Sequence, residues 1–151
     1  MSELANRALQ VAITQIGKEE IPRGSNWGEH VQKYLNSVGI NFQAAWCMAF
    51  LYWCFKQAGM VKQLPKTGGC LAMLHTVDKQ YIVKKPEVGA IVVWDHGKGL
   101  GHVGIVERVD GDKMYTIEGN TNNDGSREGY AVERKVRKIA DPKIIGYVLV
   151  S

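Results

Sequence analysis

The first forty residues carry apolar side chains at helical spacing. The segment 4–16 repeats them every three or four positions and meets a stop at Gly17, which predicts an amphipathic helix. A second apolar stripe ends at Gly39, and Asn26 is its predicted N-cap, with Glu29 three residues further on. Both segments predict helices that are half-buried against the rest of the protein.

The segment 46–58 differs because it is apolar on nearly every side before Gly59 ends it. This pattern predicts a central helix that the remaining elements enclose. A connection containing Pro65 follows, and a short helix is predicted near 71–75.

The second half of the chain is rich in Val, Ile and Tyr, in short runs separated by Gly, Asn, Asp and Pro. The predicted strands are 90–94, 102–108, 113–118, 131–136 and 144–150. Helices first and strands second favour an α+β fold with an antiparallel sheet of about five strands. A length of 151 residues fits a single domain over residues 1–151.

Composition narrows the function classes only slightly. Charged residues make up 23% of the chain and hydrophobic residues 45%, as in ordinary globular proteins. The net charge of +4 would suit an acidic polymer, but the basic residues are scattered and form no stripe with aromatics, so no nucleic-acid partner is expected.

The longest apolar run, 44–55, is too short to span a membrane, so no membrane insertion is expected. The N-terminus shows no secretory leader, which predicts synthesis in the cytoplasm and another route for any action outside.

The cysteines provide the first candidate chemistry. Three of them, Cys47, Cys54 and Cys70, leave at least one free thiol. Cys47 falls at the predicted start of the central helix, where unpaired N–H groups and the helix dipole stabilise a thiolate and could bind an oxyanion. Gln43 and Trp46, just before it, are further candidates for the oxyanion site or substrate cleft. Burial in the core is the alternative for Cys47, as assumed for the other two cysteines.

A cysteine nucleophile needs a base, and His102 is the leading candidate. Glycines on both sides of it leave space beside the ring, while apolar neighbours anchor the strand. The other histidines, His30, His75 and His96, are interpreted as surface residues, with His96 the alternative base because a loop at a strand end can carry a catalytic group.

Glu118 and Asn120 are the candidates for a third group that orients the ring. A three-residue loop at 109–111 would set His102 opposite Glu118 on one face of the sheet, whereas a two-residue loop at 110–111 would send Glu118 to the other face. The alternative interpretation of Glu118 is an exposed carboxylate on a strand, and that of Asn120 is a turn residue. The sequence does not decide whether Glu118 or Asn120 orients the ring.

The chain resembles the CHAP family of cysteine, histidine-dependent amidohydrolases and peptidases over roughly residues 20–125. The matching segments are AWCMAFLYWC from Ala45, GHVGIVE from Gly101, IEGN from Ile117, GSNWG from Gly24 with Tyr34-Leu35, and PEVGAIVVW from Pro86. The resemblance implies a papain-like core related to the NlpC/P60 group. It also implies catalytic positions at Cys47, His102, Glu118 and Asn120.

From this resemblance we expect a peptidoglycan hydrolase, an N-acetylmuramoyl-L-alanine amidase or an endopeptidase, that works as a monomer without a cofactor. Its expected partner is peptidoglycan. If the protein is a phage lysin or a delivered effector, an immunity protein, a holin or a secretion machinery would be a further partner. A housekeeping hydrolase is a third interpretation. Some relatives bind calcium through clustered aspartates, but Asp124 stands among asparagines and no cluster precedes Cys47, so no metal is expected. The alternatives are a thiol amidase or acyltransferase acting on a non-wall amide, and a wall-binding module without catalysis.

Overall fold

The computed structural model describes residues 2–121 and 129–151, and over these residues helices precede a single antiparallel sheet. The helices are α1 (Glu3–Thr14), α2 (Glu29–Ser37), α3 (Cys47–Gln57) and α4 (Cys70–Thr76), followed by a 3₁₀ turn at Lys79–Tyr81. The strands are β1 (Ile82–Val83), β2 (Ile91–Gly97), β3 (Leu100–Asp110), β4 (Lys113–Thr121), β5 (Ala131–Lys138) and β6 (Ile144–Val148). Their order in the sheet is β1-β6-β2-β3-β4-β5. The predicted α+β class is therefore confirmed.

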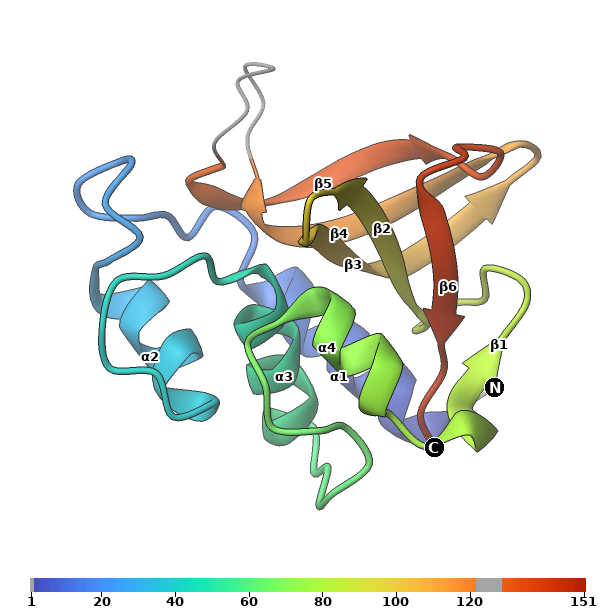
Figure 1. Ribbon diagram of the computed structural model, residues 1–151, viewed down its shortest axis with the longest axis horizontal. Helices are drawn as coiled ribbons and strands as arrows, with labels where there is room; N and C mark the ends of the chain where they lie inside the picture. The colour runs from blue at the N-terminus through green and yellow to red at the C-terminus, as the bar shows by residue number, and fades with distance from the viewer. Residues whose placement is uncertain (1, 122–128) are drawn as a thin grey trace.

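The helices gather on one side of the sheet, with α3 in their midst (Figure 1). Helix α3 contacts α1, α2, β3 and β4, and most of its side chains are buried, as its uniformly apolar sequence predicts. The main core lies between this helix layer and the inward-facing side chains of the strands, such as Val103, Ile105 and Ile117. The opposite face of the sheet holds a smaller cluster that includes Val92, Trp94 and Val106.

Three features differ from the sequence prediction, and the first is the start of α2. Its N-cap is Gly28, with φ 117°, and Asn26 lies outside the helix with φ 54°. The chain folds back here, because the Ile21 N–H donates to the Trp27 carbonyl at 2.9 Å. A Cβ at Gly28 would come within 2.9 Å of the Ile21 nitrogen, so this close approach needs glycine.

The second difference is a sixth strand, β1, which pairs with β6. It has only two residues, Ile82 and Val83, which are too few for a period-two pattern to appear in the sequence.

The third difference is the register of the β3–β4 hairpin. Asp110 pairs with Lys113 across a two-residue turn, and an irregularity between Val106 and Arg108 then sets Ile105 opposite Ile117. The turn is neither of the two considered, 109–111 or 110–111, but the irregularity sets Glu118 on the His102 face, as the three-residue loop that the catalytic interpretation requires would do. The irregularity inserts one extra residue in β3, and without it the tight turn would carry the Glu118 side chain to the other face of the sheet.

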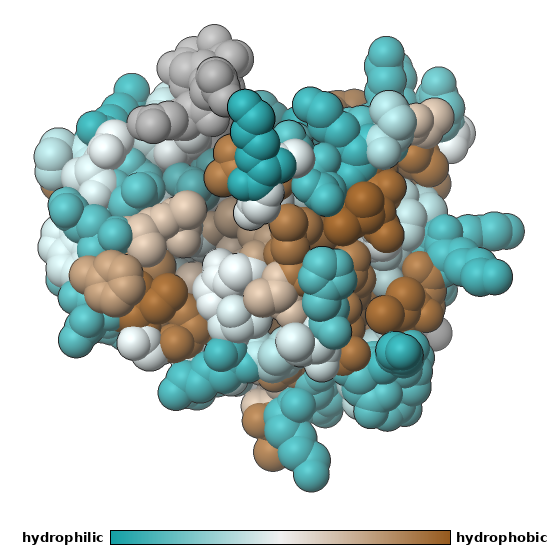
Figure 2. Space-filling model, in the orientation of Figure 1, coloured by the Kyte–Doolittle hydropathy of each residue, from teal (hydrophilic) through white to brown (hydrophobic). Residues whose placement is uncertain are grey.

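Figure 2 shows hydrophilic side chains over most of one face, with smaller hydrophobic patches between them. No helix in the described part of the chain combines the length and the apolar character needed to cross a membrane.

Candidate functional site

Cys47 is the first residue of α3, as predicted, and its side chain is buried with 5% of its surface exposed. Gln43, four residues earlier, is exposed. Trp46 is fully buried, donates from Nε1 to the Glu20 carboxylate at 2.8 Å and stacks on Tyr34. Its indole therefore cannot line a substrate cleft, which corrects that expectation. It anchors the start of α3 instead.

Cys70 lies beside Cys47, with 3.2 Å between the two sulfurs. It is the first residue of α4, so two helix N-termini meet at this point. The Cys70 hydrogen bond is the largest influence on Cys47 and lowers its pKa well below the usual range. Burial opposes this shift, and the His102 ring and the Met48 N–H add to it. The same contact, together with burial, raises the pKa of Cys70.

His102 lies on β3, and its Nε2 is 2.8 Å from the Glu118 carboxylate. Burial alone would lower the pKa of the ring, but hydrogen bonds with Cys47 and Glu118 outweigh it and raise the pKa to about 10. The ring also stacks on Trp94 at 5.7 Å between centroids. Because Nε2 is engaged by Glu118, Nδ1 is the nitrogen left for the thiol.

Glu118 is fully buried on β4, and two further donors hold it. Arg137 on β5 donates to both carboxylate oxygens, and the Thr116 hydroxyl donates to one of them at 2.6 Å. Burial would raise the pKa of this carboxyl, but Arg137 and His102 together lower it to about 2. Arg137 also lies over the Trp94 ring, 5.0 Å from its centroid. Glu118 is therefore a fixed anion at neutral pH.

The glycines around His102 admit close neighbours rather than open space. A Cβ at Gly104 would lie 2.7 Å from the Glu118 Cγ, and a Cβ at Gly101 would lie 2.9 Å from Leu71 and 3.2 Å from Cys70. If the pairing of Ile105 with Ile117 continues by one pair, Gly104 lies opposite Glu118, and Glu118 reaches His102 diagonally on the same face of the sheet.

The remaining predicted residues take no part in the contact that this structure shows between Glu118 and the ring, and the role of Asn120 stays a prediction. Asn120 adopts φ 57° and is half-buried, whereas the hydrogen bond of His102 Nε2 is with Glu118. His75 and His96 are exposed, as predicted, whereas His30 is half-buried. Asp124 lies outside the described residues. Within 2–121 and 129–151, no three potential metal ligands are grouped, and the absence of a structural metal stays a prediction.

Sequence reasoning missed Cys70, Arg137 and Trp94. Glu133 pairs with Glu118, so Arg137, four residues along β5, shares its face of the sheet. That alternation is visible in the sequence only once the β4–β5 register is known. Cys70 comes from a helix 23 residues beyond Cys47, and no local pattern links the two.

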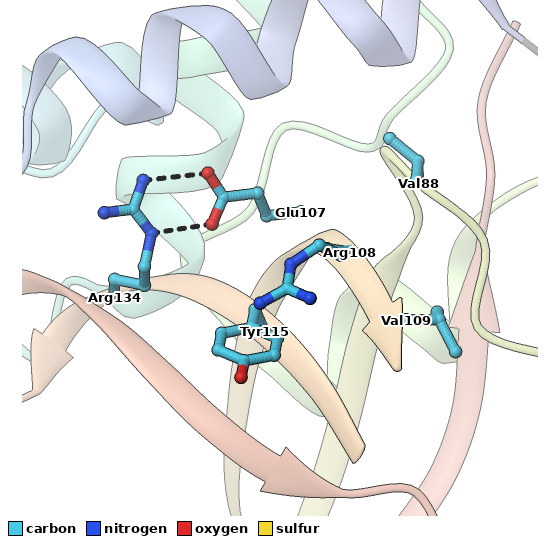
Figure 3. Close-up of a pocket in the computed structure, with 6 residues that line it drawn as sticks. All are labelled: Val88, Glu107, Arg108, Val109, Tyr115 and Arg134. Atoms are coloured by element: carbon cyan, nitrogen blue, oxygen red, sulfur yellow. Dashed lines mark hydrogen bonds and ion pairs between the residues drawn. The ribbon is translucent and has the colours of Figure 1, made fainter. Parts of the chain in front are cut away.

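An open hollow of about 590 Å³ lies away from this cluster (Figure 3). It contains a bidentate pair in which Arg134 donates to Glu107 at 2.6 and 2.8 Å, and Arg108 lies over the Tyr115 ring at 3.9 Å. Val88 and Val109 complete its lining. None of the residues around Cys47 and His102 lines it.

The helix layer, the antiparallel sheet and a cysteine at a helix N-terminus beside a histidine on a strand define the class of papain-like α+β proteins. The CHAP domain family model matches residues 39–120, and the chain belongs to this family. Two similar solved structures are crystal structures of Ly7917. One has 22% identity and a TM-score of 0.59. The other, with the hydrolyzing product of MDP, has 21% identity and a TM-score of 0.54.

Each alignment covers 97% of this chain and 62% of the Ly7917 chain, so this chain spans less than two thirds of that protein. At these identities the likeness shows a shared fold. A search of curated proteins found no significant match.

Proposed function

We propose that this protein is a cysteine hydrolase that cleaves an amide bond in the peptide part of peptidoglycan. The observation that carries the proposal is the arrangement of Cys47 at the tip of α3 with the His102 ring, which Glu118 holds by Nε2. Membership of the CHAP family and the likeness to Ly7917, whose second structure contains the hydrolyzing product of MDP, support this reaction class.

The reaction begins with a thiolate on Cys47 and an imidazolium on His102. The lowered pKa of the thiol and the ring pKa of about 10 both favour this ion pair near neutral pH. The sulfur attacks the amide carbonyl carbon, and the resulting oxyanion is stabilised by N–H groups at the start of α3, including that of Cys47. Gln43, exposed just upstream, remains a candidate for a further contact there.

His102 then donates its proton to the leaving amine as the C–N bond breaks, which leaves a thioester on Cys47 and a neutral ring. The neutral ring removes a proton from water, the water oxygen attacks the thioester, and the carboxylic acid leaves with regeneration of the ion pair.

Glu118 and Arg137 are positioning residues in this scheme. Glu118 accepts from His102 Nε2 and thereby presents Nδ1 to Cys47. Arg137 grips both oxygens of Glu118 and packs on Trp94, whose other ring contact is His102. Asn120 has no role in this scheme.

We further propose that the enzyme is an amidase or an endopeptidase and acts as a monomer on the wall after delivery by a holin, a secretion machinery or a similar route. An immunity protein would then be a further partner. The net charge of +4 favours binding to an anionic wall polymer.

The test is to incubate purified sacculi with the wild type and with Cys47→Ala, and to identify new amine termini by mass spectrometry. Cys54→Ala is the matched control, because it removes a buried cysteine from the same helix. We expect fragments from the wild type and the control only. Equal release by Cys47→Ala would refute the nucleophile assignment, and no release by any variant would favour a wall-binding module or a non-wall amide as substrate.

A further inference from the structure

Cys70 is a buried thiol that lowers the pKa of Cys47 but forms no bond to the substrate in the proposed hydrolysis. Its sulfur is 3.2 Å from that of Cys47, and both residues are reduced. A disulfide bond is about 2.0 Å long, so the sulfurs need to approach by only about 1.2 Å. The third cysteine, Cys54, is completely buried on α3 and takes no part in this contact.

The surroundings hold Cys70 against Cys47. A Cβ at Gly101 on β3 would lie 3.2 Å from the Cys70 Cβ, so the strand backbone passes close behind this residue. The pKa of Cys47 is lowered and that of Cys70 is raised, and these directions favour a thiolate on Cys47 beside a thiol on Cys70. A thiolate next to a thiol is the state in which a peroxide oxidises one sulfur and the other resolves the product.

We propose that Cys47 and Cys70 form a reversible redox pair, in which peroxide converts the reduced protein into a form locked by a Cys47–Cys70 disulfide. The inference rests on the proposed function only for its effect on catalysis, since the disulfide would occupy the nucleophile.

The chemistry proceeds in two balanced steps. The Cys47 thiolate attacks one oxygen of hydrogen peroxide, the O–O bond breaks, and sulfenic acid and hydroxide form. The Cys70 thiol then attacks the Cys47 sulfur, loses its proton and displaces the sulfenic oxygen as water. Peroxide is reduced and the two sulfurs are oxidised by two electrons in all. A dithiol reductant reverses the change by thiol–disulfide exchange.

The arrangement would also protect Cys47. Both sulfurs are nearly buried, with residue exposures of 5% and 7%, so a small oxidant has better access than a bulky one. A sulfenic acid without a neighbouring thiol is oxidised further to sulfinic acid, which dithiols do not reduce. Cys70 would intercept the sulfenic acid before that step.

The first experiment measures the chemistry without any wall substrate. Wild type, Cys70→Ala and Cys54→Ala are treated with hydrogen peroxide, quenched by thiol alkylation, digested and mapped by mass spectrometry. We expect a Cys47–Cys70 cross-linked peptide in the wild type and in Cys54→Ala, and a Cys47 peptide carrying two or three added oxygens in Cys70→Ala. Oxygenated Cys47 without the cross-link in the wild type would overturn the proposal.

The second experiment follows fragment release from sacculi, with each variant compared with its own untreated sample. Peroxide should lower wild-type activity at least about tenfold, and dithiothreitol should restore it, whereas the loss in Cys70→Ala should persist after reduction. Equal recovery in Cys70→Ala would contradict a resolving role. A wild type that forms the cross-link but never releases fragments would refute the proposed hydrolase and leave the redox pair standing.

Discussion

Replacing Glu118 with glutamine tests whether its charge, and not merely its shape, sets the state of His102. The substitution keeps the size of the side chain but removes the anion that lies 2.8 Å from His102 Nε2. Arg137 stays in place, so its positive charge then faces the ring without an intervening carboxylate. Both changes disfavour the imidazolium, and the pKa of His102 should fall from about 10.

The size of the fall follows from the geometry. Two unit charges 2.8 Å apart at an effective dielectric of about 20 interact by about 6 kcal/mol, which is an upper bound. An opposite charge in direct contact commonly shifts a pKa by roughly 1–3 units, or about 1.4–4 kcal/mol. If that free energy stabilises the thiolate–imidazolium pair, its loss should lower kcat/KM by roughly 10- to 1,000-fold.

The assay combines two measurements. Nuclear magnetic resonance of protein with ¹⁵N-labelled histidine reports the pKa of the ring directly. The pH profile of fragment release reports its effect on kcat/KM, with an alkaline limb near pH 10 in the wild type that moves to lower pH in Glu118→Gln.

Glu107→Gln is the matched control. Glu107 also accepts two hydrogen bonds from an arginine on β5, but it contacts Arg134 and no histidine. Its activity should stay within about twofold of the wild type, because the pair is partly exposed and separate from Cys47. A Glu118→Gln protein that keeps the wild-type His102 pKa and kcat/KM would refute the electrostatic role of Glu118.

Three further predictions concern the same cluster. The pKa of Glu118 falls from its ordinary 4.5 to about 2 on folding, so the ionised carboxylate should contribute about 3 kcal/mol to the free energy of unfolding. This contribution should be complete above pH 4.5 and lost as the pH falls through 2. Urea unfolding across this range should show the loss in the wild type and not in Glu118→Gln. Gly104→Ala should cost about 1–3 kcal/mol in thermal or urea unfolding and lower activity, because its Cβ would meet Glu118 Cγ at 2.7 Å. In His102→Gln the alkylation of Cys47 by iodoacetamide should begin at a higher pH than in the wild type, because the ring helps to lower the pKa of the thiol. Mass spectrometry follows the extent of alkylation at each pH. An unchanged pH profile would mean that Cys70 alone activates the thiol.

The sequence was sufficient to predict the elements that have strong periodicity. The apolar segment 46–58 became α3, and the five strands rich in Val and Ile all formed. The failures occurred where a close backbone approach or a pairing decides the geometry. Asn26 has the chemistry of an N-cap, but the contact between Gly28 and Ile21 placed the helix start at Glu29.

In the candidate site, too, residues with a distinctive local pattern could be predicted and residues placed by tertiary contacts could not. Cys47 and His102 could be proposed because each sits in a distinctive local pattern, a helix start and a glycine-flanked strand. Glu118 could be placed on the His102 face only by assuming an extra residue in the hairpin. The structure supplies that residue as an irregularity near Glu107 instead of as a longer loop. Tertiary partners such as Arg137 and Cys70 carry no such local signature.

One of these missed partners, Arg137, helps to explain how a half-buried histidine remains charged. Burial of the His102 ring would by itself favour the neutral form, and burial of Glu118 would favour a protonated carboxyl. Arg137 offsets the cost of burying the Glu118 carboxylate by donating to both of its oxygens. The Glu118 anion and the Cys47 sulfur together offset the cost of burying a charged His102 ring. The charges along Arg137, Glu118, His102 and Cys47 therefore alternate in sign. The ionised forms of Glu118 and His102 are favoured by the charged groups on either side of them, and the His102 ring adds to the effect of Cys70 on the Cys47 thiol. A substitution at Arg137, although remote from the sulfur, should for this reason raise the pKa of Cys47 and lower the fraction of thiolate.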